Sequence, residues 1–464
     1  MYNFTTIERL DRPSKKVDER IQNYEEIYED FPDTIAKNQA SRCIQCGIPY
    51  CTSSDNGCPL HNHIPQWLKL IAEDDLELAF QMSNKTSPFP EILGKICPHN
   101  RLCEGACTLN DGHGAVTIGS VEVHINEKGF REGLTPSFPD QLSDKKVAII
   151  GSGPSGLSCA NFLLRAGIRP TVFEASDEAG GLLIYGIPGF KLTKSDVDRR
   201  VNLLQKAGME LKLSTRVGKD VSFEQLQQDY DAVFLALGAS EGRVLGYEGY
   251  NSDQVFMAMS FLTQTQRRVL AKDFDPKYGV ANKDVLVIGG GDTAMDCVRT
   301  CIRSGANSVK CVYRRDEENM PGSTKEVKAA KEEGVQFVFQ TAPKNFVADE
   351  NGNIIGMKMI KTELQQTAEN ARAKVIEVAN TEHLLEADII ILALGFNHQK
   401  IDFLNNVGVK TNEFGGVDID ANGQTSIEGV FAGGDMVRGA DLAVNAALDG
   451  REVAFQIMRY LKKL

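Results

Sequence analysis

Seven cysteines near the start of the chain form its densest group of side chains that bind metals. Their spacing is C-x2-C-x4-C-x6-C followed by C-x5-C-x3-C, and they are Cys43, Cys46, Cys51, Cys58, Cys97, Cys103 and Cys107. A structural zinc site commonly uses two short C-x2-C pairs, and this region has one. Cys58 and Cys97 each precede a proline, as in ferredoxin cysteine runs. The pattern therefore favours two [4Fe–4S] clusters over zinc, with cysteine supplying seven of about eight ligands.

The order of these cysteines predicts that the first run serves both clusters. In two-cluster ferredoxins the last cysteine of a run ligates the other cluster. By analogy, Cys43, Cys46 and Cys51 hold one cluster, and Cys58 belongs to the other. The remaining cysteines fall inside predicted strands and helices, where we expect small buried hydrophobic side chains: Cys159, Cys297, Cys301 and Cys311.

A first glycine-rich loop predicts a dinucleotide-binding site. The run VAIIGSGPSG carries G-x-G-x-x-G directly after a predicted strand and before the helix-like LSCANFLLRAG. The first glycine suits a tight turn, the second lets the backbone approach a pyrophosphate, and the third lets the helix pack on the strand. N–H groups at the start of the helix would bind the phosphates. The loop residues expected at the cofactor are Gly151, Gly153, Pro154, Ser155 and Gly156.

A second loop has the same frame but a different residue type after its next strand. The first unit's next strand, PTVFEA, carries Glu174 where a carboxylate accepts hydrogen bonds from ribose hydroxyls. In the second unit the corresponding strand ends in Arg314 and Arg315, whose guanidinium groups suit the 2′-phosphate of NADP. The first site is therefore predicted to bind FAD and the second NADPH. The second loop, of the form G-x-G-x-x-A, comprises Gly289, Gly290, Gly291, Asp292 and Thr293.

Three further segments are expected near these nucleotides. In the run FAGGD, Asp435 after Gly434 would bond the ribityl chain, and the next helix would point its N-terminus at the flavin ring. The segment GGLLIYGIPGFKL, with Gly181 and Leu182, is expected along the flavin, and Gly395 ends an aliphatic strand of the second unit. Hydride transfer itself needs no acid or base, so no catalytic residue is predicted. The alternatives are a second NAD(P) site in place of FAD and an inactive second unit.

Composition and charge exclude several other classes of protein. The chain has 464 residues, of which 42% are hydrophobic and 25% charged, with a net charge of −12. This charge argues against nucleic acid or an anionic membrane surface as a partner. No apolar run is long enough to span a membrane, and MYNFTTIERLDRPSKK lacks the apolar core of a secretory signal. We therefore expect a cytoplasmic protein, in which disulfides are disfavoured.

The pattern of apolar residues divides the chain into a helical part and an α/β part. Stretches such as RIQNYEEIYEDF and IPQWLKLIAEDDLELAFQM have helical spacing. Two later series repeat the order strand, glycine turn, helix, strand and late aliphatic strand, which predicts two doubly wound dinucleotide-binding domains. The fold class is therefore α/β with a helical iron–sulfur domain in front. The predicted boundaries are 1–143 for the cluster domain, 144–242 and 396–464 for the FAD domain, and 243–395 for the NADPH domain.

Almost end to end, these motifs resemble the small (β) subunit of bacterial NADPH-dependent glutamate synthases. The matching stretches include CIQCGIPYC, ICPHNRLCEGACTLN, AVTIGSVEVHINEKGF, VAIIGSGPSGLSCA, GGLLIYGIPGFKL, VIGGGDTAMDC, YRRDEENMPGS and GVFAGGDMVRGADLAVNAALDGREVA. The resemblance implies FAD, NADPH and two [4Fe–4S] clusters. It also implies a large (α) subunit as partner, which carries FMN, hydrolyses glutamine and reduces the imine of 2-oxoglutarate.

The same resemblance implies how the cluster ligands are shared. It places Cys43, Cys46, Cys51 and Cys107 on one cluster, and Cys58, Cys97 and Cys103 on the other. It also suggests Glu122 as the eighth ligand, against His61, His63, His99 and His124 as competitors and against an ordinary surface glutamate. The family commonly has about three residues between the positions of Cys51 and Cys58, whereas TSSDNG makes the loop longer here.

The expected function is the input of electrons from NADPH. Hydride would pass to FAD, and single electrons would leave through the clusters to a large subunit that makes glutamate. The main alternative is a subunit of the ferredoxin–NADP oxidoreductase type with another electron-transfer partner; a non-enzyme alternative is a flavin-binding sensor or assembly protein. A glutathione-reductase-like disulfide enzyme is rejected, because ASDEAGGLLIYGIPGFKL after Glu174 contains no cysteine.

Overall fold

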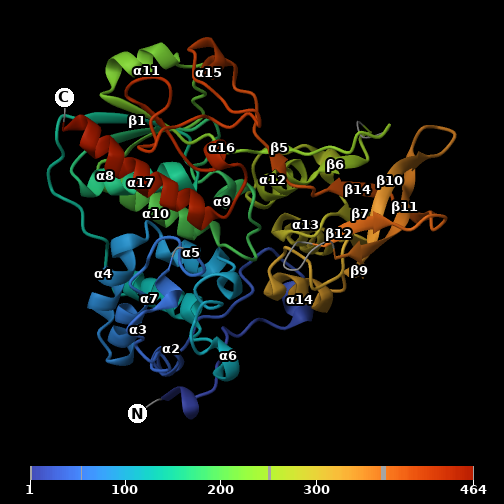
Figure 1. Cartoon of the computed structure of the whole chain (residues 1–464), viewed down its shortest axis with the longest axis horizontal. Helices are drawn as coiled ribbons and strands as arrows, with labels where there is room; N and C mark the ends of the chain where they lie inside the picture. The colour runs from blue at the N-terminus through green and yellow to red at the C-terminus, as the bar shows by residue number, and fades with distance from the viewer. Residues whose placement is uncertain (1–2, 54, 249–251, 367–372, 463–464) are drawn as a thin grey trace.

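The computed structural model describes residues 3–53, 55–248, 252–366 and 373–462. Figure 1 shows three units: a helical unit in blue, a first sheet unit in green and red above it, and a second sheet unit in yellow and orange beside both. This arrangement confirms the predicted fold class, a helical domain followed by two doubly wound α/β domains. The first sheet unit is built from two stretches of chain, one before and one after the second unit.

Short helices joined by loops build the helical unit. The run IPQWLKLIAEDDLELAFQM forms two helices, because the chain turns at Asp74 (φ +66°) and Asp75 caps the second by accepting a hydrogen bond from the N–H of Leu78 at 3.0 Å. The elements are η1 (Asn3–Thr5), α1 (Val17–Arg20), α2 (Asp33–Ala40), η2 (Tyr50–Thr52), α3 (Ile64–Ala72), α4 (Leu76–Thr86), α5 (Pro90–Ile96), η3 (His99–Arg101), α6 (Asn110–His113) and α7 (Ile118–Arg131).

The helix predicted for RIQNYEEIYEDF is wrong. Helix α1 ends at Arg20, and residues 21–31 form turns and an extended segment. Tyr24 bonds Ser304 of the second sheet unit (Oη to Oγ, 2.7 Å), whereas Glu26 accepts from Lys95 of the helical unit at 2.7 Å. The N–H of Ile27 donates to the carbonyl of Phe190 at 3.2 Å. These contacts with three parts of the molecule override the local helical pattern.

The first sheet unit contains a parallel sheet in the order β16-β4-β1-β2-β3. Its strands are β1 (Lys146–Ile150), β2 (Arg169–Phe173), β3 (Glu210–Lys212), β4 (Ala232–Leu235) and β16 (Val430–Ala432). The central strands β1 and β4 are buried along almost their whole length, as a sheet covered on both faces requires. The helices are α8 (Pro154–Arg165), α9 (Leu182–Tyr185), α10 (Lys194–Lys206), α11 (Phe223–Asp229), α15 (Asp402–Asn406), α16 (Asp435–Arg438) and α17 (Ala443–Leu461).

The second sheet unit has the same parallel arrangement in the order β6-β14-β7-β8-β9, except that its edge strand β6 is the first in the chain, whereas β16 is the last of the first sheet. Its strands are β6 (Val255–Met257), β7 (Asp284–Ile288), β8 (Ser308–Val312), β9 (Gln336–Val338) and β14 (Ile389–Leu392), with helices α12 (Ala258–Val269), η4 (Pro276–Tyr278), α13 (Asp292–Arg303) and α14 (Thr324–Glu332). An antiparallel sheet, visible at the edge of Figure 1, adds β10 (Thr341–Ala348), β11 (Ile354–Gln365), β12 (Lys374–Glu377) and β13 (His383–Glu386).

The chain crosses between the two sheet units at one place. Strand β5 (Glu241–Gly242) leads into the second unit and pairs antiparallel with β15 (Phe396–Asn397), which leads back. One continuous hydrophobic core runs from the helical unit, for example Trp67 and Phe80, into the first sheet unit at Ile149 and Phe431. The two cores of the second sheet unit draw their fully buried residues from residues 256–393.

Candidate functional site

In the first glycine loop, protein atoms crowd Gly151 and Gly156, whereas the space beside Gly153 is open. A Cβ on Gly151 (φ +103°) would lie 2.3 Å from the carbonyl oxygen of Ala236, and one on Gly156 would lie 2.0 Å from the carbonyl oxygen of Gly151. At Gly153 a Cβ would meet no atom within 4 Å. Two positions therefore need glycine for packing, and the third leaves room for a ligand next to the backbone.

Buried oxygens without partners lie next to this loop. Among the described residues, neither Oγ of Ser155 nor Oδ1 of Asp435 has a hydrogen-bond partner, although both atoms are buried. The two residues are neighbours, because a Cβ on Gly434 (φ +75°) would lie 2.9 Å from the Cβ of Ser155. Burial raises the pKa of Asp435 to about 7. A hydroxyl-rich group such as the ribityl chain of FAD fits these oxygens, since buried polar atoms need partners.

Glu174 lies at the mouth of the same loop and is buried. Its Oε2 accepts hydrogen bonds from Ser152 (N at 3.0 Å and Oγ at 2.6 Å), and its Oε1 accepts from the N–H of Ser176 at 2.8 Å. The carboxylate is therefore held in place beside the glycines, where a ribose would meet it.

The segment predicted to lie along the flavin touches the loop at Gly153. Gly181 (φ +55°) packs so closely that a Cβ there would lie 2.9 Å from the Cα of Gly153, and Leu182 begins α9 with 40% of its surface exposed. Lys194, to which no sequence motif points, holds this segment in place. Its Nζ donates to the carbonyls of Leu183 (2.8 Å) and Ile187, and burial lowers its pKa to about 7.

The second glycine loop has the same geometry. A Cβ on Gly289 (φ +148°) would lie 2.2 Å from the carbonyl oxygen of Ala393, one on Gly290 would lie 2.4 Å from the Tyr313 ring, and Gly291 faces open space. Asp292 starts α13 and accepts from the N–H of Ser323 at 2.8 Å. The helix start at Asp292 and Thr293 therefore offers N–H groups to a pyrophosphate. Gly395 (φ +88°) lies farther along, where its carbonyl accepts from the N–H of Arg243 at 3.0 Å.

Arg314 and Arg315 lie in different environments. Arg314 is exposed, whereas Arg315 is 7% exposed and donates through a guanidinium nitrogen to the carbonyl of Ala373 at 2.7 Å. The structure therefore does not present the two guanidinium groups as a matched pair. Arg314 is the one with a side chain free to reach a phosphate in solvent.

The first set of cysteines surrounds one small apolar hollow. Cys43, Cys46, Cys51 and Cys107 all line it, together with Tyr50 and other apolar residues. Burial, reinforced by the neighbouring thiols, raises the pKa of Cys51 to about 12 and that of Cys43 to about 11. Thiolates in such a place need a cationic iron–sulfur core to offset the cost of burying their charge. The four thiols around this hollow therefore have the chemistry of the ligand set of one iron–sulfur cluster.

The second set gathers in the interior of the helical unit. Cys58 and Cys103 are buried, and burial raises the pKa of the thiols of Cys58, Cys97 and Cys103, with the nearby Glu122 carboxylate raising each of them further. Glu122, on α7, is 6% exposed, so the alternative of a surface glutamate is wrong. Burial raises its pKa to about 8, and its Oε1 accepts from Nδ2 of Asn62 at 3.1 Å.

Two of the competing histidines already have partners. A ring nitrogen of His61 pairs with the carbonyl of Thr52 at 2.9 Å, and one of His124 pairs with that of Phe31 at 3.0 Å. Across the described ranges, no three histidine, cysteine, aspartate or glutamate side chains form a group able to hold one metal ion. The four cysteines outside these sets are fully buried, as the sequence predicted: Cys159, Cys297, Cys301 and Cys311.

A cavity of about 600 Å³ lies where the three units meet. Its walls include Cys97 from the second cysteine set, Thr293 at the start of α13, and Leu442 and Ala443 at the start of α17. The cavity therefore touches a predicted cluster ligand, the predicted NADPH loop and the helix expected to face the flavin.

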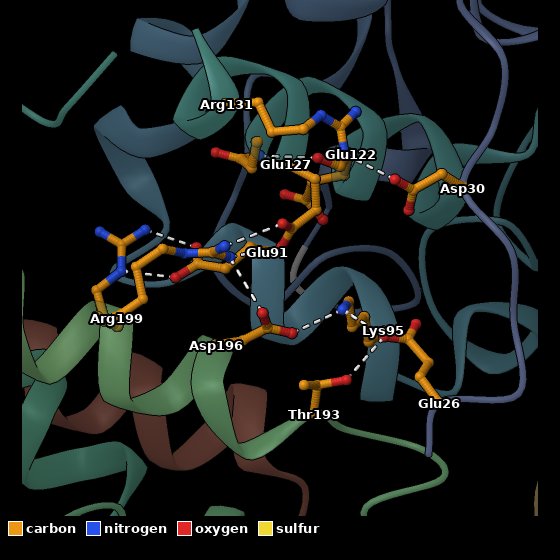
Figure 2. A network of polar contacts seen from close by, with 12 residues as sticks. Glu26, Asp30, Glu91, Lys95, Glu122, Glu127, Arg131, Thr193, Asp196 and Arg199 are labelled. Atoms are coloured by element: carbon orange, nitrogen blue, oxygen red, sulfur yellow. Dashed lines mark hydrogen bonds and ion pairs between the residues drawn. The ribbon is translucent and has the colours of Figure 1, made fainter. Parts of the chain in front are cut away.

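A polar network joins α5 and α7 of the helical unit to α10 of the first sheet unit, and Figure 2 shows it from close by. Lys95 binds Asp196 at 2.6 Å, and Arg199 binds Glu127 through both carboxylate oxygens. Arg200 and Glu91, both fully buried, form a similar two-bond pair at 2.8 and 2.6 Å. These contacts fix α5, which precedes Cys97, and α7, which carries Glu122, on the first sheet unit.

Arg451 makes a second connection between the same two units. From α17, it donates to the carbonyls of Leu60 at 2.8 Å and Thr86 at 3.0 Å. Leu60 follows the ligand candidate Cys58 by two residues, so the cysteine loop is anchored directly on the flavin unit. The stretch GVFAGGDMVRGADLAVNAALDGREVA contains Arg451, but no spacing rule identified this role.

Comparisons with known proteins cover the whole chain. Residues 145–450 match the family model described as pyridine nucleotide-disulphide oxidoreductase, and residues 20–134 match dihydropyrimidine dehydrogenase domain II, 4Fe-4S cluster. The chain is 44% identical to the glutamate synthase [NADPH] small chain of Escherichia coli, covering 100% of this chain and 99% of that protein. It is 43% identical to the same-named protein of Halomonas elongata, covering 99% and 98%.

Two further comparisons broaden this picture. The chain is 42% identical to the putative oxidoreductase AegA of Escherichia coli, over 96% of this chain and 68% of that longer protein. The solved structure of Mycobacterium tuberculosis FprA in complex with NADPH has the same fold over 69% of this chain and 85% of that one, with a TM-score of 0.58 and 17% identity. In the part of the chain that the structure describes, no helix is both long and apolar enough to cross a membrane.

Proposed function

Because this chain belongs to the family of the glutamate synthase [NADPH] small chains, we propose that it is the electron-input subunit of a glutamate synthase. Membership makes it an NADPH-dependent oxidoreductase with a flavin-type nucleotide domain and an iron–sulfur domain. Its proposed partner is a large subunit that makes glutamate from glutamine and 2-oxoglutarate. Two [4Fe–4S] clusters, rather than one, are part of the proposal.

The observation that carries this proposal is the cavity shared by the three units. When bound, the nicotinamide supplies a hydride, and the flavin and clusters divide its two electrons into single ones. Thr293, in one wall, and the open backbone at the neighbouring Gly291 would hold the nucleotide, and the start of α17, in another wall, would face the flavin. Cys97 on a third wall puts the second cysteine set within reach of the same space.

The first cysteine set is placed to serve as the exit. Ile48 and Tyr50 lie between Cys46 and Cys51 in sequence, and they are 75% and 60% exposed. Large apolar side chains left in solvent are typical of surfaces that meet a partner. The set they border therefore lies close to the surface, where electrons can pass to a large subunit.

Each of the eleven cysteines is described and free of disulfide, which suits the cytoplasmic location that we also propose.

A second candidate is a ferredoxin–NADP oxidoreductase-type subunit with a different partner. The similarity to AegA favours keeping it, because a chain of this build there forms part of a longer putative oxidoreductase. Both candidates share the path from NADPH to the clusters and differ in the acceptor. Co-purification of the tagged chain from its own cell distinguishes them, since a large glutamine-dependent chain is expected only for the first.

The purified chain tests the proposal directly. With NADPH it should reduce an artificial electron acceptor, and it should make no glutamate from glutamine and 2-oxoglutarate. Glutamate should form when the large subunit is added. Glutamate formation by the chain alone, or failure of NADPH to reduce its flavin, would refute the proposed role.

A further inference from the structure

The loop between α9 and α10 inserts two side chains into the second sheet unit. Phe190 is fully buried, and its ring lies under the guanidinium groups of Arg299 (4.6 Å) and Arg303 (4.0 Å) of α13. The next residue, Lys191, places its Nζ 2.7 Å from Oδ1 of Asp296 and 3.7 Å from Oε2 of Glu326. Two residues of the first sheet unit, the predicted flavin unit, are therefore held directly by two helices of the second sheet unit, the predicted NADPH unit.

Lys191 is shared by two carboxylates in an enclosed place. Only 12% of its side chain is exposed, and 9% of each carboxylate side chain. Burial lowers the pKa of the Lys191 ammonium, but the two carboxylates more than offset this, so its net shift is upward. The ammonium is therefore charged at neutral pH. Without it, two acidic groups would face each other in the interior without a shared cation.

A buried chain of ion pairs continues from this point. Glu326 binds Arg299 at 2.5 Å, and Arg299 binds Glu333 at 2.8 Å. Glu333 also accepts from Arg20 of the N-terminal segment at 2.9 Å. Three separate parts of the chain thus meet in one network, which we call the joint: Arg20; Phe190 and Lys191; and Asp296, Arg299, Glu326 and Glu333, which lie on α13, on α14 and directly after α14.

The joint lies in the wall of the cavity shared by the three units, which Lys191, Asp296 and Glu326 all line. Asp296 is one helical turn after Thr293 at the start of α13. On the other side, Lys191 continues the segment that contacts Gly153 through Gly181. The Lys191–Asp296 pair therefore connects the two glycine loops by a short path through the structure.

We propose that Lys191 is a positioning residue for hydride transfer, which holds the NADPH unit at the angle that brings the nicotinamide against the flavin. The inference rests on the proposed function and adds a residue that neither glycine loop supplies. The two sheet units have separate buried cores, so an oriented ion pair between them has a larger influence on their relative angle than it would inside one core. Misplacement of reacting groups by about 1 Å can slow a reaction by about 10²-fold.

The test is anaerobic stopped-flow reduction of the flavin by NADPH in Lys191→Met, which keeps the length of the side chain and removes its charge. We expect the rate of flavin reduction to fall by about 10- to 100-fold. The Kd for NADP+ should change by less than about threefold, because the nucleotide-binding residues remain. The long-wavelength charge-transfer absorbance of reduced flavin with NADP+ should weaken, since it reports stacking of the two rings. Lys191→Arg should retain most of the rate and of this absorbance.

Two further variants serve as a control and a reserve. Lys331→Met removes an exposed ion pair between Lys331, on the same helix α14 as Glu326, and Glu317, which precedes that helix; it should leave the rate and absorbance unchanged. If Lys191→Met does not bind FAD, Asp296→Asn is judged by the same measurements. A wild-type rate, an unchanged absorbance, an equal fall in rate and NADP+ affinity, or an arginine variant as slow as the methionine one would overturn the role of Lys191. Failure of the wild-type flavin to accept hydride from NADPH would instead overturn the proposed function itself.

Discussion

The two sheet units share one parallel arrangement of strands and differ in how they attach to the rest of the molecule. The first shares a continuous apolar core with the helical unit. The second is held across its boundary by charged pairs, including Lys191 with Asp296, Arg267 with Asp177, and Arg101 with Asp292. Apolar packing is non-directional and gains from area, whereas ion pairs depend on orientation. The helical and first sheet units are thus joined by a common core in addition to buried pairs such as Arg200 with Glu91, whereas the second sheet unit keeps separate cores and is joined to them by charged pairs and by Phe190.

This difference suits the chemistry that each boundary must support. Electrons crossing from flavin to cluster need a fixed separation, which a common core provides. A nicotinamide nucleotide must enter and leave at every turnover, so its unit benefits from a boundary that specific charged contacts orient and that shares no continuous core.

The largest effect is expected at Glu122, inside the helical unit. Glu122→Ala should lower the iron content from about eight atoms per chain towards about four, because one cluster loses a ligand. Iron analysis and electron paramagnetic resonance provide the measurement. Glu132→Ala, at the exposed end of the same helix, is the matched control. Full iron content with an unchanged cluster signal in Glu122→Ala would show that this carboxylate is no ligand.

A smaller but still large effect is expected for the buried pair of Arg200 and Glu91. Arg200→Leu leaves Glu91 buried without its partner and should reduce the free energy of unfolding by about 3–5 kcal/mol. Denaturant unfolding of the cofactor-loaded chain measures this. The double variant with Glu91→Leu should lose less than Arg200→Leu alone. Arg101→Ala, which removes a partly exposed pair at the other boundary, should cost less than about 1 kcal/mol. A larger loss of unfolding free energy in Arg101→Ala than in Arg200→Leu would contradict the expected difference between the two boundaries.

The smallest effect concerns the choice of nucleotide in the second sheet unit. Arg314→Ala should raise KM for NADPH by about 10- to 100-fold, the equivalent of one lost charged hydrogen bond, and leave KM for NADH nearly unchanged. Arg315→Ala should instead affect both nucleotides alike, because Arg315 is buried and donates to the backbone of Ala373. Steady-state kinetics with both nucleotides test this. Equal changes in KM for NADPH and NADH in Arg314→Ala would show that Arg314 does not contact the 2′-phosphate.

The sequence predicted the features that depend on local geometry. Gly151 and Gly289 stand at positive φ beside the carbonyls of Ala236 and Ala393, and a G-x-G motif after a strand specifies such a turn wherever it occurs. The fold class followed from two series of strands and helices with the same order. The division of the cysteines into two sets came from the resemblance to a family, since spacing alone did not assign Cys107 to the first set.

Features that depend on contacts between distant segments were not predicted. The helix expected for residues 20–31 is replaced by an extended path, because Tyr24 and Glu26 bind partners far away in sequence. Nothing around Lys191 marks Asp296 as its partner, since 105 residues separate them. Arg314 and Arg315 are adjacent in sequence, but β8 already ends at Val312, and both residues lie in the bend that follows it, where Arg315 turns into the protein and Arg314 stays exposed.

The crossing at β5 and β15 has a consequence for the order in which a nascent chain can mature. Residues between those strands form the NADPH unit as one uninterrupted stretch, whose local sheet can assemble as soon as it leaves the ribosome. The flavin sheet has to wait, because its edge strand β16 and the covering helix α17 are translated after that whole insertion. Until then β4 has an open edge, and the early half of the flavin unit depends on its shared core with the helical unit to remain compact.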